Sequence, residues 1–84
     1  MLTEEDVIAK ASRLSIHNRI MIELSKKCGC YYCTKIFDAE RVKDYIDADD
    51  TAICPFCGID SVLPDASVSN LDKKLIKKVR MRWF

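Results

Sequence analysis

This sequence of 84 residues lacks the features that mark membrane and secreted proteins. No apolar run approaches the roughly 20 residues that a helix needs to cross a bilayer. The first residues, Met1 to Asp6, are acidic, whereas a secretory signal is first basic and then apolar. The formal net charge of +1 indicates no partner of either sign. These absences predict a cytoplasmic protein.

Patterns of catalytic residues are missing as well. His17 is the only histidine, and no serine nucleophile elbow, pair of carboxylates or phosphate-binding loop accompanies it. Asp47, Asp49 and Asp50 lack the ligand order and the final glutamate of a calcium-binding loop. The sequence therefore predicts a protein that is not an enzyme, with a packing or capping histidine and a solvated acidic loop.

The composition predicts a folded chain that needs a cross-link. Hydrophobic residues make up 49% of the sequence and charged residues 32%, a balance typical of globular proteins. A chain of this length buries a core with little margin, so an additional staple is expected. The five cysteines are an odd number, and a reducing cytoplasm disfavours disulfides. A metal ion is therefore the better explanation of the cysteines.

Two Cys-x-x-Cys pairs carry the strongest signal in the sequence. Cys30 and Cys33 form the first pair and Cys54 and Cys57 the second, a spacing typical of zinc sites with four thiolate ligands. Four protein ligands leave no open position for water, so we predict one structural Zn²⁺ that contributes on the order of 10 kcal/mol to folding. A rubredoxin-like iron site is the alternative. Cys28 is left over as a buried thiol or as a replacement for Cys30.

Local signals predict an α+β fold, a small zinc-ribbon-like domain with helices on both sides. Thr3 is the expected cap of a helix over residues 4–14. Gly29 is expected to end the helical segment over residues 16–27. Asp38 is the expected cap of a short helix between the two cysteine pairs. The other expected elements are a segment over residues 16–27 that forms a second helix or extends the first, a short strand near 35–37, a hairpin of strands 51–53 and 59–63, and an amphipathic helix over 71–84.

The predicted organisation is one zinc-binding domain that covers the whole chain. Its parts are a helical N-terminal region (1–27), a metal-binding core (28–63), a polar linker (64–70) and a C-terminal basic helix (71–84).

Charge is distributed unevenly along the chain. Residues 38–65 hold eight acidic and two basic groups, and residues 66–84 hold one acidic and six basic groups. This separation favours a non-enzymatic protein-interaction or regulatory adaptor with a protein partner, and nucleic-acid binding through the basic helix is the alternative. Trp83 is expected to pack on the domain. The candidate partner-binding residues are Lys73, Lys74, Lys77, Lys78, Arg80 and Arg82.

Aromatic residues cluster in sequence around the cysteine pairs. Packing around the metal site is the expected role of these rings, because a small domain needs them to shield the thiolates. Stacking against a nucleobase is the alternative. The residues concerned are Tyr31, Tyr32, Phe37, Tyr45 and Phe56.

The cysteine motifs also support a resemblance. The run Cys28-Gly-Cys-Tyr-Tyr-Cys33, the run from Thr51 to Leu63 that contains Cys-Pro-Phe-Cys-Gly-Ile-Asp-Ser-Val, and the closing Trp83-Phe84 resemble a group of small bacterial and phage-type cytoplasmic proteins. The resemblance extends from about His17 onwards. It implies a zinc site and a cytoplasmic location, and it implies no activity.

Overall fold

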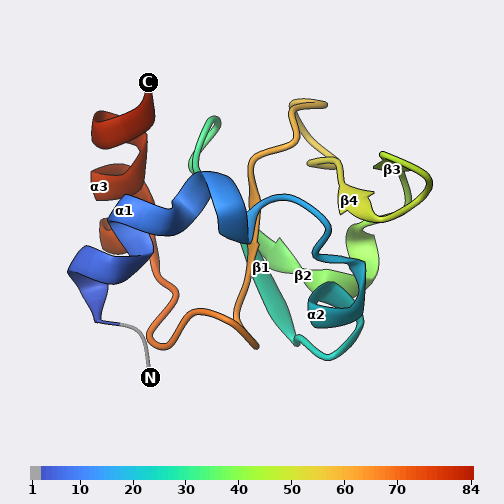
Figure 1. Cartoon of the computed structure of the whole chain (residues 1–84), viewed down its shortest axis with the longest axis horizontal. Helices are drawn as coiled ribbons and strands as arrows, with labels where there is room; N and C mark the ends of the chain where they lie inside the picture. Colours follow the sequence, from blue (N-terminus) through green and yellow to red (C-terminus); the bar gives the residue numbers. More distant parts are fainter. Residues whose placement is uncertain (1–2) are drawn as a thin grey trace.

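The computed structural model describes residues 3–84 (Figure 1). Residues 1 and 2, the start of the predicted N-terminal region, lie outside the described part. The α+β prediction is confirmed by three α-helices and two antiparallel sheets. The elements are α1 (Glu4–Leu14), α2 (Arg19–Glu23), β1 (Lys27–Cys30), β2 (Ile36–Asp38), the 3-10 helix η1 (Ala39–Arg41), β3 (Tyr45–Ile46), β4 (Thr51–Ala52), β5 (Val62–Pro64) and α3 (Lys73–Trp83).

Helix α1 has the predicted bounds because its capping signals are local. The Thr3 hydroxyl accepts a hydrogen bond from the Asp6 backbone N–H, and the Asp6 carboxylate accepts one from the Thr3 N–H. This second bond favours the ionised carboxylate and lowers the pKa of Asp6. Val7 and Ala11 lie on the buried face of the helix. In the part of the chain that the structure describes, no helix has both the length and the apolar character of a membrane span.

The segment after α1 is less helical than predicted. His17 adopts a positive φ of 47°, so α1 and α2 are separate helices, and α2 has five residues. Ile20 and Leu24, two apolar residues of this segment, are each 70% exposed. Gly29 lies inside β1 and does not end a helix. The prediction failed here because β1 pairs with strands on both sides, which sequence spacing alone does not reveal.

Asn18 joins the α1–α2 connection to both sheets. Its buried side-chain NH₂ donates to the backbone oxygens of Leu14 (3.1 Å) and Val62 (2.9 Å). Its side-chain oxygen accepts a hydrogen bond from the Ala52 N–H at 3.1 Å. These bonds satisfy three buried polar groups on different elements, so Asn18 links α1, β4 and β5.

The strand pairing differs from the predicted hairpin. The three-stranded sheet has the order β2-β1-β5, with Cys28 opposite Phe37 and Gly29 opposite Leu63, and β3 pairs with β4 in a separate sheet. The predicted pairing of residues 51–53 with 59–63 is therefore wrong. Pairing with β1 places Val62 and Leu63 at 0% exposure, which favours this arrangement.

The helix predicted between the cysteine pairs is also wrong. Residues 39–41 form a single 3-10 turn, and Val42 is already extended. Asp38 makes no capping hydrogen bond and instead accepts one from the Lys27 Nζ at 2.5 Å. The chain then enters β3, which pairs with β4 and so excludes a longer helix here.

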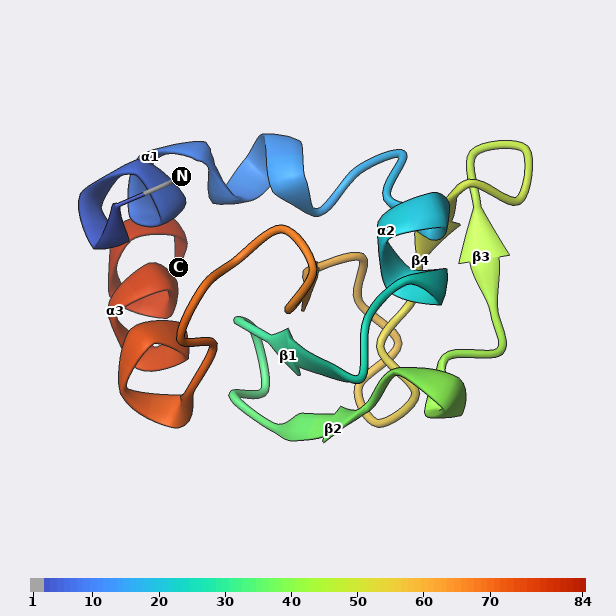
Figure 2. The same cartoon turned by 90° about the horizontal axis from the view of Figure 1, so that it is seen from below.

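The β1–β5 layer separates two buried clusters, because neighbouring residues of a strand face opposite sides. One cluster surrounds the cysteines and contains Val62, and the other contains Leu63 and lies under α1 and α3. Helices α1 and α3 lie side by side at one end of the molecule (Figures 1 and 2). A Cβ at Gly29 would lie 2.8 Å from the Ile76 Cδ1, so this glycine lets α3 approach β1 closely.

Helix α3 is amphipathic as predicted, with one correction. Leu75, Ile76 and Val79 are buried, and the Asp72 carboxylate caps the helix by accepting the Leu75 N–H at 2.8 Å. Trp83 was expected to pack on the domain, but it is 37% exposed, and its Nε1–H donates to the Ile8 oxygen at 2.7 Å. The predicted linker is not purely polar surface either, because it contributes Val68, 1% exposed, to the core.

Candidate metal centre

The structure brings the four predicted ligands together. All four Sγ atoms lie within 4.8 Å of one another, and the Cys30–Cys57 and Cys33–Cys54 sulfur pairs are 3.6 and 3.7 Å apart. A tetrahedral ion with metal–sulfur bonds of about 2.3 Å places its ligands about 3.8 Å apart. A disulfide needs about 2 Å between its sulfurs, and all four cysteines are free thiols. The arrangement therefore fits a single metal ion with four sulfur ligands.

Each pair of cysteines lies on a tight turn, and we call residues 30–34 the first knuckle and residues 54–58 the second. The Tyr32 N–H lies 3.4 Å from the Cys30 Sγ, and the Phe56 N–H lies 3.4 Å from the Cys54 Sγ. Backbone N–H groups that point at sulfur stabilise the thiolate form. The same bonds recur at matching positions because both turns fold alike: Thr34 N–H to Cys30 oxygen (2.8 Å), Gly58 N–H to Cys54 oxygen (3.0 Å), Cys30 N–H to Lys35 oxygen (3.0 Å) and Cys54 N–H to Ile59 oxygen (3.0 Å).

The residue after each second cysteine is left-handed. Gly58 has a φ of 77°, and no atom lies within 4 Å of where its Cβ would be. Thr34 takes the matching position in the first knuckle with a φ of 63°. A β-branched residue pays a steric cost in this conformation that glycine does not. The knuckle turn thus imposes its backbone geometry even where the sequence disfavours it.

Ser61 is a neighbour of the site that the sequence analysis missed. Its side chain is buried, and its Oγ lies 3.0 Å from the Cys30 Sγ. The hydroxyl can donate to the thiolate and so orient this ligand. Ser61 reaches the site because its backbone oxygen accepts the Tyr31 N–H, in line with the β1–β5 pairing. No local pattern signals this contact.

Cys28 lies outside the group of four. It is fully buried beside β2 and β5, and burial raises the pKa of its thiol to about 12. The structure thus assigns Cys30 rather than Cys28 to the cluster. Burial is also the main reason that the pKa of the Cys57 thiol is raised to about 12, with the neighbouring Cys30 and Cys54 adding to the effect. A cation among these sulfurs would reverse this preference for the neutral form.

The aromatic residues divide into two groups. Phe37 is buried in the cluster that surrounds the cysteines and Tyr45 packs against that cluster, as expected, whereas Tyr31 is buried in the other cluster, under α1 and α3. Tyr32 and Phe56, the third residue of each Cys-x-x-Cys motif, are 41% and 47% exposed. Phe56 packs one side on Phe37, with ring centroids 5.7 Å apart. Each knuckle therefore presents an aromatic ring to solvent.

The candidate partner-binding residues of α3 do not all behave as expected. Lys78 pairs with Glu4 at 3.1 Å. Arg80 is half-buried, donates a hydrogen bond to the Tyr32 oxygen and lies over the Tyr32 ring. These two side chains therefore serve the fold. Among residues 3–84, the remaining four form no ion pair and stay exposed: Lys73, Lys74, Lys77 and Arg82.

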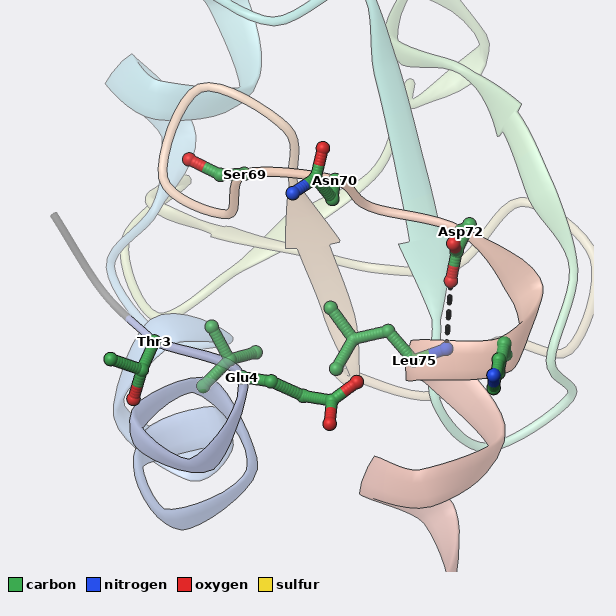
Figure 3. Close-up of a pocket in the computed structure, with 8 residues that line it drawn as sticks. Thr3, Glu4, Ser69, Asn70, Asp72 and Leu75 are labelled. Atoms are coloured by element: carbon green, nitrogen blue, oxygen red, sulfur yellow. Dashed lines mark hydrogen bonds between the residues drawn. The ribbon is translucent and has the colours of Figure 1, made fainter.

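Neither His17 nor the pocket between α1 and α3 belongs to the centre. The His17 ring is exposed, and its Nδ1 contacts an Asp50 carboxylate oxygen at 3.1 Å. A pocket of about 410 Å³ lies between the starts of α1 and α3 (Figure 3). Its polar atoms include the helix caps Thr3 and Asp72, which already accept backbone N–H groups. Among residues 3–84, the four cysteines are the group that could hold a metal ion.

The comparisons with known proteins add no further constraint. No protein-family model, curated protein or solved structure matches the chain.

Proposed function

We propose that this protein is a zinc-binding module with a structural site, and that it acts as a non-enzymatic protein-interaction or regulatory adaptor in the cytoplasm. The observation that carries the metal site is that the four sulfurs lie within 4.8 Å of one another, with two pairs near the spacing of about 3.8 Å that a tetrahedral site requires. Zinc is favoured over iron because it is the ion usual in structural sites of this spacing. A reducing compartment suits five free cysteines.

A structural role follows from the coordination. Four thiolates complete the shell of the ion, so no position remains for a water or a substrate. Cys30 and Cys54 are buried, and the metal would join β1 to the loop after β4, two segments far apart in sequence. The ion would therefore act as the staple that a core of this size needs.

Binding would use the free lysines of α3. Lys73, Lys74 and Lys77 are exposed and have no acidic partner among residues 3–84. The acidic turn between β3 and β4 lies at the opposite end of the molecule (Figure 1). Such separation of charge orients a partner on approach and favours an acidic protein surface against α3.

Two measurements test this function. Elemental analysis of the purified protein should give about one zinc per chain in a colourless solution, and a red, iron-containing protein would support the electron carrier instead. Affinity capture from the native cell, followed by nuclease treatment, should leave a protein partner bound. The triple variant Lys73→Gln/Lys74→Gln/Lys77→Gln should lose that partner and keep its melting temperature, because exposed charges contribute little to stability.

Nucleic-acid binding is the second candidate. It is favoured by the dense positive charge of α3, which has six basic residues and no acidic one. A partner that nuclease removes, and whose affinity falls steeply with salt, would support this candidate over the adaptor.

A further inference from the structure

We propose that the two knuckles and the end of α3 form a binding surface for single-stranded nucleic acid. The site is distinct from the lysine face of α3, and it rests on the proposed function because the metal would hold both knuckles in place. We call the residues concerned the knuckle surface: Tyr32, Lys35, Arg41, Phe56, Arg80 and Phe84.

Exposed rings are the first observation. Tyr32 and Phe56 occupy matching positions on the two turns, and Phe84 at 61% exposure joins them. The ring centroids of Tyr32 and Phe84 are 5.0 Å apart, and Phe56 is backed by Phe37. Rings fixed by neighbours lose little entropy on binding, and their exposed parts suit flat partners such as unpaired bases.

Positive charge accompanies these rings. The Lys35 Nζ lies 4.5 Å from the Phe56 centroid and the Arg41 Cζ 5.9 Å from it, while the Arg80 Cζ lies 5.1 Å from the Tyr32 centroid. None of these three cations forms an ion pair with residues 3–84. Arg80 is half-buried and already donates a hydrogen bond to the Tyr32 oxygen, so it supports the ring, and the exposed Lys35 and Arg41 are the cations available to phosphates. Exposed cations next to aromatic rings match a chain that alternates phosphates and bases.

The two knuckles face the same side of the molecule. In Figure 1 both knuckles, residues 30–34 and 54–58, project from the upper side, where α3 also ends. Contacts agree with this view, because Phe84 packs on the ring of Tyr32, and Lys35, which follows the first knuckle, lies over Phe56 of the second. One strand could therefore reach both rings.

A single strand fits this surface better than a duplex does. Bases in a duplex are stacked on each other and cannot stack on side chains, whereas an unpaired strand can turn its bases outward. The surface therefore predicts a preference for single strands that depends on the rings.

Fluorescence anisotropy with labelled oligothymidine and oligouridine of about 12 nucleotides, and with a DNA duplex of similar length, tests the inference. The zinc-loaded protein should bind the single strands more tightly than the duplex. Phe56→Leu and Tyr32→Leu should each weaken single-strand binding about tenfold, whereas Phe56→Tyr and Tyr32→Phe should keep the affinity because they keep the ring. All four substitutions keep the backbone N–H groups of residues 32 and 56, which point at sulfur. The zinc content of each purified variant should be measured to check that it is loaded.

Salt dependence supplies a second measurement. Lys35→Gln and Arg41→Gln should each reduce the slope of log affinity against log salt by about 0.7, if each side chain contacts one phosphate. The triple lysine variant of α3 is the matched control and should preserve the ratio of single-strand to duplex affinity.

Three results would overturn the inference. The zinc-loaded protein does not bind single strands, it binds the duplex as tightly as single strands, or both leucine variants bind single strands as tightly as the wild type. Retained zinc and a retained protein partner would show that this inference has failed alone. A purified wild-type protein without zinc would mean that the proposed structural site has failed as well.

Discussion

The guanidinium of Arg80 lies over the ring of Tyr32, with its Cζ 5.1 Å from the ring centroid, and joins α3 to the first knuckle. Arg80→Met keeps the aliphatic stem but removes the charge and the hydrogen bond to the Tyr32 oxygen. We expect it to lower the free energy of unfolding by about 1 kcal/mol, as for a partly exposed cation–π contact.

Thermal unfolding of the zinc-loaded protein measures this effect. Lys77→Met is the matched control, because Lys77 is exposed on the same helix and has no ion pair with residues 3–84. Equal effects of the two substitutions would show that Arg80 does not link α3 to the knuckle.

Removal of the metal should unfold the domain. Cys57→Ser, or chelation of the wild type, deletes an interaction worth on the order of 10 kcal/mol, which exceeds the stability expected of so small a core. Circular dichroism should show loss of the cooperative melt. Cys28→Ala should retain one zinc per chain, because Cys28 lies outside the group of four sulfurs. A folded metal-free protein would make the site peripheral.

Ser61→Ala should weaken the metal site without unfolding the loaded protein. It removes the hydroxyl 3.0 Å from the Cys30 Sγ, and loss of such a partner typically reduces metal affinity about tenfold or more. Competition with a chromophoric chelator gives the affinity. Ser67→Ala is the control, because Ser67 lies in the segment between β5 and α3, and unchanged affinity in both variants would contradict a role for Ser61.

The left-handed positions of the two knuckles should respond oppositely to exchange. Thr34→Gly relieves a β-branched residue at φ 63° and should be neutral or stabilising by up to about 1 kcal/mol. Gly58→Thr introduces the same strain at φ 77° and should destabilise by about 1–2 kcal/mol. Denaturant unfolding with excess zinc measures both. The strain argument fails if the two substitutions change stability in the same direction.

Trp83→Ala should cost less than a buried tryptophan would. Full burial would imply about 3–5 kcal/mol, but the side chain is 37% exposed, so we expect about 2 kcal/mol. Trp83→Phe keeps a ring and loses the hydrogen bond to the Ile8 oxygen, which should cost about 1 kcal/mol. Urea unfolding separates these values, and a cost above 3 kcal/mol for Trp83→Ala would indicate a larger packing role.

Local sequence signals predicted what is local in the structure. The cap at Thr3 predicted the start of α1, and the spacing of the two Cys-x-x-Cys pairs predicted the four clustered sulfurs. The wrong hairpin has a different cause. Residues 51–53 and 59–63 are close in sequence, but β5 pairs with β1, more than 30 residues away, because that pairing buries Leu63 against the helices. Such pairing depends on tertiary packing that no window of sequence contains.

The helix expected after Asp38 failed for a similar reason. Its apolar spacing suited a helix, but the same residues can serve a strand, and the partner β4 decided between them. Ser61 reaches the site through the pairing of β1 with β5, and the Asn18 side chain forms hydrogen bonds with β4 and β5. Both contacts join residues far apart in sequence, so neither role was visible in the sequence.

The three hydrogen bonds of the Asn18 amide bear on how the protein ages. Hydrolysis of that amide to a carboxylate would replace a donor with a negative charge facing the oxygens of Leu14 and Val62. Asparagine usually hydrolyses after attack by the next backbone nitrogen, here that of Arg19, whose N–H is held by the Asp50 oxygen at 3.0 Å. We therefore expect the folded chain to protect this amide, so that damage at Asn18 accumulates in proportion to the time spent unfolded.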